Sequence, residues 1–454
     1  MNLTFNLLAG AARLDITPPL GTIINGDFVT HYARSIHDPL FAKALWLETA
    51  REVLVIVVVD ICVMGQELID EAKGLIQEEL SVPPGAILIS STHTHAAGSV
   101  EEVHLVPADL SYRQRIPLSI ARAVKEAAKR KQPARLAFGS AQAPEHLLCR
   151  RFWMQEDYYP RNPVTGGRDA LKTNPFGAEN QIIGPVSDPD PELGFLAVQG
   201  IQGEWIGLLA NYSLHYVGDW ENGTITADYF GAFSEALRQQ LGAEESFVGM
   251  LSNGTSGDVN IWDFRNEKHY PEAHFSKSKF IGEALAAKVL AQLDLLHWET
   301  DPELSYRYEE IRVNRRLPDE AALLQAKDLV ARADFEHLIP TPEGLRFLYA
   351  REQILLAQFA KVATCPVQLF SIGSGRIGAL AGEVFAETGL QIKQASAGRP
   401  YFTVGLANGN LGYLPPAKAL ELGGYETWRC RISNLDGEAE EILRMKMIDW
   451  LSSH

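Results

Sequence analysis

Apolar residues recur along the chain in two spacings, and their order predicts an α/β fold. Apolar spacing of three and four residues predicts helices at 66–80, 113–131, 228–241, 277–293 and 438–451. Short, nearly continuous apolar runs, typical of buried strands, lie at 42–48, 53–60, 87–91, 194–199, 205–211, 247–251, 367–372, 376–381 and 401–406. This alternation predicts a large single catalytic domain of mixed β-sheets flanked by helices.

Two regions depart from the alternation. Residues 143–190 are rich in Pro, Gly, Asn and aromatic residues and show no periodicity, which is typical of a functional loop that packs over a cleft. Residues 319–360 are strongly helical, with a break at Pro340 and Pro342. They indicate a possible helical subdomain, 318–361, inside one domain that spans 1–454.

Composition narrows the classes of partner. The chain carries 57 acidic and 41 basic residues, a net charge of −16, and has no basic block, so no nucleic-acid partner is predicted. The longest apolar run, 53–59, is far shorter than the ~20 residues of a membrane span, and no secretory signal is evident at the start. Four widely separated cysteines indicate reduced thiols, and together these features favour the cytoplasm. The sequence does not specify an oligomeric state.

Polar side chains with chemical potential follow several of the predicted strands. His93 and His95 come directly after the run 87–91, and residues two apart in an extended segment project to the same side. His215 follows another strand, and Glu383 follows a strand and a glycine, where a buried carboxylate requires a partner or a cation. The pattern fits a metal or catalytic site, and it equally fits histidines satisfied by local hydrogen bonds.

Nine stretches in one order carry a resemblance to a known family. The chain resembles the zinc-dependent catalytic domain of the neutral/alkaline, non-lysosomal ceramidases, without the C-terminal β-sandwich of the larger members. The matching stretches are AGAARLDITPPLG, HDPLFAKALWLE, VVVDICVM, STHTHAAG, NYSLH, ITADYFGAFSEAL, SNGTSGDVN, LAGEVFAETG and GLANGNLGYLPP.

The resemblance implies a site and assigns residues to it. One Zn²⁺ per chain is expected, although the donor types do not exclude other divalent transition metals. His95 is implied as a catalytic imidazole beside the metal and Arg150 as an oxyanion-binding residue, while His37, Ser256 and Asn260 fall on the substrate side. The implied metal ligands are His93, His215, Glu383 and Tyr413.

One departure from the family pattern changes the expected chemistry. Asn260 stands in Gly257-Asp258-Val259-Asn260 where the family has its serine nucleophile, and an amide cannot take that role. We therefore predict a zinc-dependent hydrolase that cleaves an amide or ester bond of a small polar substrate with a metal-activated water. The alternative is a zinc-dependent lyase, epimerase or isomerase of a small hydroxylated or sugar-like substrate. A true ceramidase or a zinc-binding scaffold without activity is less favoured.

Overall fold

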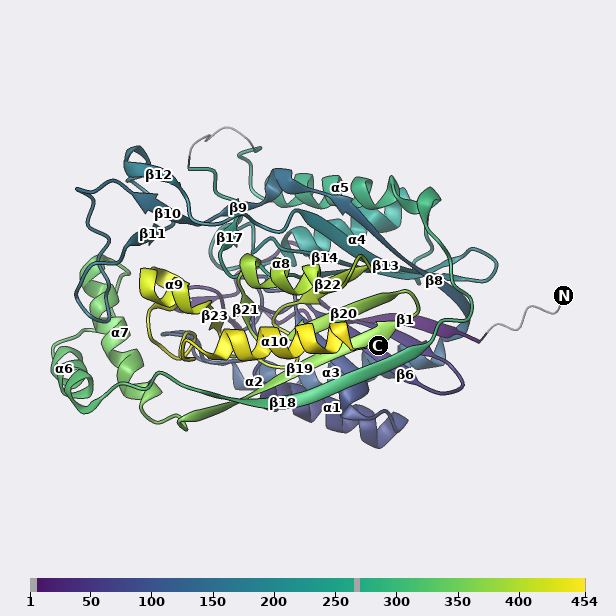
Figure 1. Cartoon of the computed structure of the whole chain (residues 1–454), viewed down its shortest axis with the longest axis horizontal. Helices are drawn as coiled ribbons and strands as arrows, with labels where there is room; N and C mark the ends of the chain where they lie inside the picture. The colour runs from purple at the N-terminus through teal and green to yellow at the C-terminus, as the bar shows by residue number, and fades with distance from the viewer. Residues whose placement is uncertain (1–5, 265–269, 454) are drawn as a thin grey trace.

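The computed structural model describes residues 6–264 and 270–453 and is built around an eight-stranded mixed sheet (Figure 1). Neighbouring strands are antiparallel through its centre, and only the outermost pair at each edge is parallel. The order is β16 (Val248–Asn253), β14 (Trp205–Tyr212), β13 (Glu192–Gly200), β8 (Gln132–Gln142), β1 (Leu8–Asp15), β5 (Phe41–Glu48), β6 (Val53–Val59) and β7 (Ile87–Ser91).

Four helices cover one face of this sheet. Gly10 on β1 abuts the backbone of α3, and Phe195 on β13 packs in the cluster that holds the helices α4 and α5. The strand register places Gly10 and Phe195 on the same face, so all these helices lie on one side. They are α1 (Gln66–Leu80), α3 (Ile116–Lys129), α4 (Asp228–Gln240) and α5 (Ser276–Leu290).

A second, four-stranded sheet packs on the opposite face, where Gly194 of β13 meets Phe402. Its order is β18 (Leu304–Asn314), β19 (Val362–Ile372), β20 (Gly375–Leu380) and β22 (Tyr401–Val404). Phe370 and Ile372 of β19 join the core of the large sheet, whereas Val367 and Leu369 pack under α10 (Ala439–Ser452). With α8 (Ala386–Gln394) also on the outside, the molecule has helix, sheet, sheet and helix layers (Figure 1).

Residues 143–190 are more structured than predicted. They form β9 (Leu148–Cys149) and a three-stranded sheet of β11 (Leu171–Thr173), β10 (Arg151–Met154) and β12 (Ile182–Pro185). The aromatic Phe152 packs into a local cluster with Phe264, and Tyr159 is exposed, so neither covers the cleft described below. The segment is not the single irregular loop that was expected, because strands of two to four residues leave no periodic signal. It nevertheless contributes to the lining of the cleft, as expected of a segment that packs over it, through Lys172, Thr173, Asn174 and Phe176.

The helical region is a hairpin of α6 (Glu320–Val330) and α7 (Pro342–Leu356). Pro342 starts α7, and the Thr341 hydroxyl accepts a hydrogen bond from Gly344 N, so the proline marks a helix start. Tyr349 of α7 packs edge-on against Trp428, 5.5 Å between ring centroids. The remaining short elements are β2 (Ile23–Ile24), β3 (His31–Tyr32), β4 (Ser35–Ile36), β15 (Thr224–Ile225), β17 (Val259–Asn260), β21 (Glu383–Val384), β23 (Tyr413–Leu414), α2 (Leu110–Arg113) and α9 (Ala417–Leu422).

The ends of several strands meet at one place. The segment after β22 joins the two edges of the large sheet, because Gly405 N donates to Asn253 O of β16 (3.0 Å) and Ser91 N of β7 donates to Leu406 O (3.2 Å). Leu406 N in turn donates to Gly382 O, just beyond β20 (3.0 Å). All four cysteines are free and buried. Among the described helices, none combines the length and the apolar character needed to cross a bilayer.

Candidate metal centre

His93 and His215 lie at this junction of strand ends. His93 follows β7 and has a left-handed backbone (φ 75°), while His215 follows β14. The extended geometry predicted for residues 93–95 is therefore wrong, because β7 ends at Ser91 and His93 turns its side chain out of the strand direction. The imidazoles of His93 and His215 nevertheless converge, with 3.1 Å between their Nε2 atoms.

Backbone carbonyls fix the tautomer of both rings. Nδ1 of His93 lies 2.8 Å from the Cys62 carbonyl oxygen, and Nδ1 of His215 lies 3.2 Å from the Ser256 carbonyl oxygen. A carbonyl only accepts, so both Nδ1 atoms carry the proton and both Nε2 atoms present lone pairs. Two lone pairs 3.1 Å apart repel unless a cation lies between them, and this orientation of the far nitrogen is typical of metal-ligating histidines.

Glu383, which follows β20 of the second sheet, completes the group. Its Oε2 lies 3.6 Å from His93 Nε2 and 3.7 Å from His215 Nε2. Oε2 is buried without a hydrogen-bond partner among the described residues. The parallel pairing of β21 and β23 sets Glu383 directly beside Tyr413, whose hydroxyl contacts the carboxylate. The four residues implied as ligands by the family resemblance are thus brought together.

The spacing of these atoms fits one small cation. Ligands at the usual ~2.0–2.1 Å from a tetrahedral divalent metal lie about 3.3 Å from each other. His93, His215 and Glu383 offer atoms 3.1–3.7 Å apart, all from buried side chains. Nitrogen and carboxylate oxygen donors suit a divalent transition metal.

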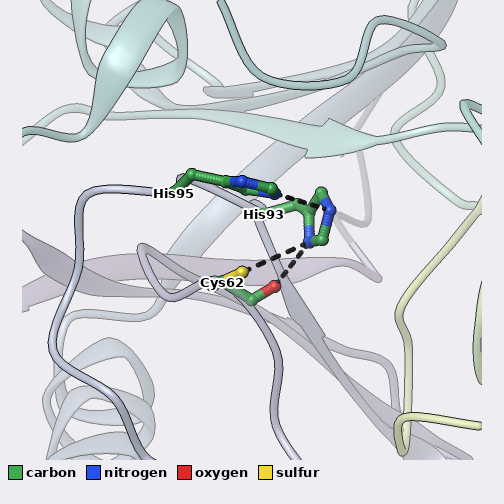
Figure 2. A group of neighbouring side chains, drawn as sticks. All are labelled: Cys62, His93 and His95. Atoms are coloured by element: carbon green, nitrogen blue, oxygen red, sulfur yellow. Dashed lines mark hydrogen bonds between the residues drawn. The ribbon is translucent and has the colours of Figure 1, made fainter. Parts of the chain in front are cut away.

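A second group, Cys62 with His93 and His95, also has metal-ligand residue types (Figure 2). Figure 2 shows the Cys62 sulfur and carbonyl oxygen on the Nδ1 side of His93, and the sulfur lies 3.8 Å from that nitrogen. Nδ1 donates its proton to the carbonyl, so the sulfur lies on the protonated side of the ring and away from the Nε2 lone pair. Burial also raises the pKa of the Cys62 thiol well above its ordinary value, so the thiol stays protonated. The first group is the better metal site.

His95 stands beside this group. Its Nε2 lies 3.1 Å from His93 Nε2, and its ring stacks on Tyr216 with 3.7 Å between centroids. Gly26 packs so closely on His95 that a side chain at position 26 would place its Cβ 2.5 Å from the Cβ of His95. Burial lowers the pKa of His93 to about 4 and those of His95 and His215 well below the ordinary value, so all three rings are neutral.

Arg150 lies against the other side of the group. Its guanidinium donates from Nε to Glu426 (2.7 Å) and from Nη2 to the Gly257 carbonyl (2.7 Å) and the Tyr413 hydroxyl (3.1 Å). Arg151 instead points at Glu426 and the carbonyl of Gly423. Of the two adjacent arginines, Arg150 is therefore the one that reaches the site, as predicted.

The three residues assigned to the substrate side do not meet there. Ser256 lies behind His215 and donates to Asn253 Oδ1 (2.6 Å), and Asn260 donates to Asn174 Oδ1 (2.6 Å). His37 stacks on Phe275 and lines a different cavity, of about 760 Å³. None of the three lines the cleft over the candidate metal centre.

That cleft has a volume of about 600 Å³ and includes residues the sequence did not single out. His31 Nε2 and Asp27 Oδ2 form a pair at 2.8 Å in it, and the ring nitrogens of buried His104 have no hydrogen-bond partner among the described residues. These residues lie in short strands or loops, where no periodicity marks them. The charged and aromatic lining comprises Asp27, Phe28, His31, His93, His95, His104, Arg150, Lys172, Phe176, His215, Tyr216, Trp220, Trp262, Glu383, Tyr413, Tyr425 and Trp428.

The protein has a mixed α/β fold of four layers, two of which are sheets. A buried His–His–Glu–Tyr group lies where the strands of these sheets end and forms a candidate metal centre. The neutral ceramidase from Pseudomonas aeruginosa has the same fold: the TM-score is 0.73 at 17% sequence identity, over 99% of this chain and 74% of that one. A ceramidase complexed with C2 aligns with a TM-score of 0.71 at 17% identity, over 99% of this chain and 75% of that one.

No family model matches the sequence, and no curated protein does. The resemblance drawn from the nine stretches is thus confirmed at the level of the fold. The chain has the mixed α/β fold of neutral ceramidases.

Proposed function

We propose that the protein is a zinc-dependent hydrolase that cleaves an amide or ester bond of a small polar substrate. The observation that carries the proposal is the arrangement of His93 and His215, whose Nε2 atoms lie 3.1 Å apart in a cleft of about 600 Å³. Their lone pairs face Oε2 of Glu383, which has no hydrogen-bond partner among the described residues. The shared fold with neutral ceramidases, whose name denotes amide hydrolysis, supports the same reaction class.

His93, His215, Glu383 and Tyr413 would hold the ion. Zinc bound there supplies a Lewis acid for a carbonyl oxygen and lowers the pKa of water to about 7. The two carbonyls behind the histidines and the Arg150 contact to Tyr413 keep the ligands aimed at one point.

The remaining side chains would handle the proton and the developing charge. His95 is neutral and held by its stack on Tyr216, so its Nε2 can accept a proton from the attacking water and return it to the leaving group. Arg150 is fixed by Glu426 and presents a positive charge beside the same point, where it can stabilise a tetrahedral oxyanion by several kcal/mol.

A direct attack by water agrees with the lining of the cleft. No serine lines it among the described residues, and Asn260 does not line it but donates a hydrogen bond to the lining residue Asn174. A covalent serine intermediate therefore has no candidate nucleophile here. The polar lining, which includes Asp27, Lys172 and Asn174, favours a small polar substrate.

Metal analysis tests the proposed site. We expect about one transition metal per chain in the wild type and its loss in His93→Ala and His215→Ala, with unchanged far-UV circular dichroism. His297→Ala is the matched control, because His297 is exposed and outside the cleft. Equal metal content in all four proteins would overturn the assignment.

The reaction class is tested in labelled water with a panel of N-acyl amino acids and simple esters. Hydrolysis incorporates oxygen-18 into the product carboxylate. Carbon-bound deuterium without oxygen incorporation would favour the lyase, epimerase or isomerase alternative. Turnover that survives in His93→Ala would contradict both.

A further inference from the structure

One cation that lines the cleft has no ion-pair partner among the residues that the structure describes. Apart from histidines, the charged lining residues are Asp27, Arg150, Lys172 and Glu383. Asp27 pairs with His31, Arg150 pairs with Glu426, and Glu383 belongs to the candidate metal centre. Within the described part of the chain, no carboxylate lies within ion-pair distance of Lys172.

Lys172 is the central residue of β11 and lines the cleft, as does its neighbour Thr173. Leu171 and Thr173 face the segment at Gly424, and the Thr173 hydroxyl donates to Glu426 (2.8 Å). Lys172 projects from the opposite face of the strand. It is half-buried, and burial lowers the pKa of its ammonium, with Asp169 and Glu426 opposing the shift. A partly dehydrated, unpaired ammonium favours an incoming anion.

The charged groups near Lys172 are of both signs, because the carboxylates of Asp169 and Glu426 also act on it. Glu426 is shared by the guanidinium groups of Arg150 and Arg151, so these three side chains carry a net charge of about +1. Asn174 N donates to the Arg150 carbonyl (2.8 Å), which ties the end of β11 to this group. Arg150 has most of its donors engaged, whereas Lys172 is available. Together with Lys172 and Asp169, this group carries a net charge of about +1 inside a protein of net charge −16, which favours an anion as ligand.

We propose that Lys172 is a specificity-determining residue that binds a carboxylate of the substrate, so that the substrate class is a small anionic amide or ester. This rests on the proposed function for the bond that is broken. The bound carboxylate would lie on the wall formed by β11, and the scissile carbonyl would lie at the candidate metal centre.

The test measures binding of two small probes to the metal-loaded protein. N-acetylglycine carries a carboxylate and N-acetylglycinamide does not, and Trp220, Trp262 and Trp428 in the lining report occupancy by fluorescence, with calorimetry as a second readout. We expect the carboxylate to bind about tenfold more tightly than the amide, as for a charge-assisted contact. Lys172→Gln should abolish this preference and Lys172→Glu should reverse it. Lys327→Gln, an exposed lysine outside the cleft, should leave it unchanged.

Two results would overturn the proposal: equal binding of both probes to the wild type, or a preference that survives in Lys172→Gln. The second would mean that a metal or another residue holds the carboxylate. Because the assay reads binding, it separates this proposal from the reaction itself. A metal-free His93→Ala protein that retains the preference for N-acetylglycine would support the role of Lys172 even if hydrolysis were absent.

Discussion

Glu426 is the buried carboxylate that binds both Arg150 and Arg151. It is fully buried and accepts from Arg150 (2.7 Å), Arg151 (2.9 Å) and the Thr173 hydroxyl (2.8 Å). Burial alone would raise the pKa of Glu426, but the two guanidinium groups hold it below its ordinary value, so the carboxylate is charged. One carboxylate therefore both compensates two buried cations and fixes the direction of Arg150.

Replacing Glu426 by Gln should lower the free energy of unfolding by about 3–5 kcal/mol, because it leaves two buried guanidinium groups without a counter-charge. Urea unfolding followed by circular dichroism measures the loss. Glu421→Gln is the matched control, since Glu421 is exposed on α9, and it should change stability by less than ~0.5 kcal/mol. Equal effects in the two variants would contradict this account.

Helices with a clear period and strands with a continuous apolar run could be predicted from the sequence, whereas the short strands and the long strands β1, β8 and β18 could not. The helix over 66–80 and the strand over 87–91 are present as predicted. Strand β18 has no continuous apolar run to mark it, because most of its residues are polar and its few buried residues alternate with exposed ones. The two-residue strands β21 and β23 carry no pattern at all, yet their pairing sets Glu383 beside Tyr413. The ligands could be proposed only from family motifs, and their convergence required the structure.

The pairing of β21 with β23 depends on a glycine. Gly412 has φ of 72°, and a Cβ there would lie 2.0 Å from the Ile432 carbonyl oxygen. Its own carbonyl accepts from Glu383 N (2.9 Å). We expect Gly412→Ala to lower both stability and metal content, because the strand that carries Tyr413 must move.

Gly74→Ala is the control for Gly412→Ala, and it should change stability in the opposite direction. Gly74 lies inside α1 with open space around it, so the alanine should stabilise the protein by up to ~1 kcal/mol and leave metal content unchanged. Thermal unfolding and metal analysis on both variants decide the matter. Normal metal content in Gly412→Ala would show that the pairing does not position Tyr413.

At the scale of the molecule, function and stability have separate sources. The two histidines among the proposed ligands follow β7 and β14 of the large sheet, whereas the glutamate and the tyrosine lie in β21 and β23. The strands of the large sheet and of the second sheet are anchored in apolar clusters. Arg150 and the ligands could be proposed from motifs, whereas Asp27, His31 and Lys172 reach the cleft only through the packing of loops and short strands. The side chains that line this part of the cleft therefore could not be predicted.

Removing the metal should leave the protein folded. The apolar clusters that hold the sheets include Leu45, Val57 and Phe370, and they do not depend on the candidate metal centre, unlike the core of a small zinc-stabilised domain. We expect chelation to leave the far-UV and near-UV circular dichroism unchanged at 25 °C and to lower the melting temperature by several degrees, since metal binding adds about RT ln(1 + [M]/Kd) to stability. Turnover should disappear and return with added Zn²⁺. Unfolding upon chelation at 25 °C would instead assign the metal a structural role and make the protein a scaffold.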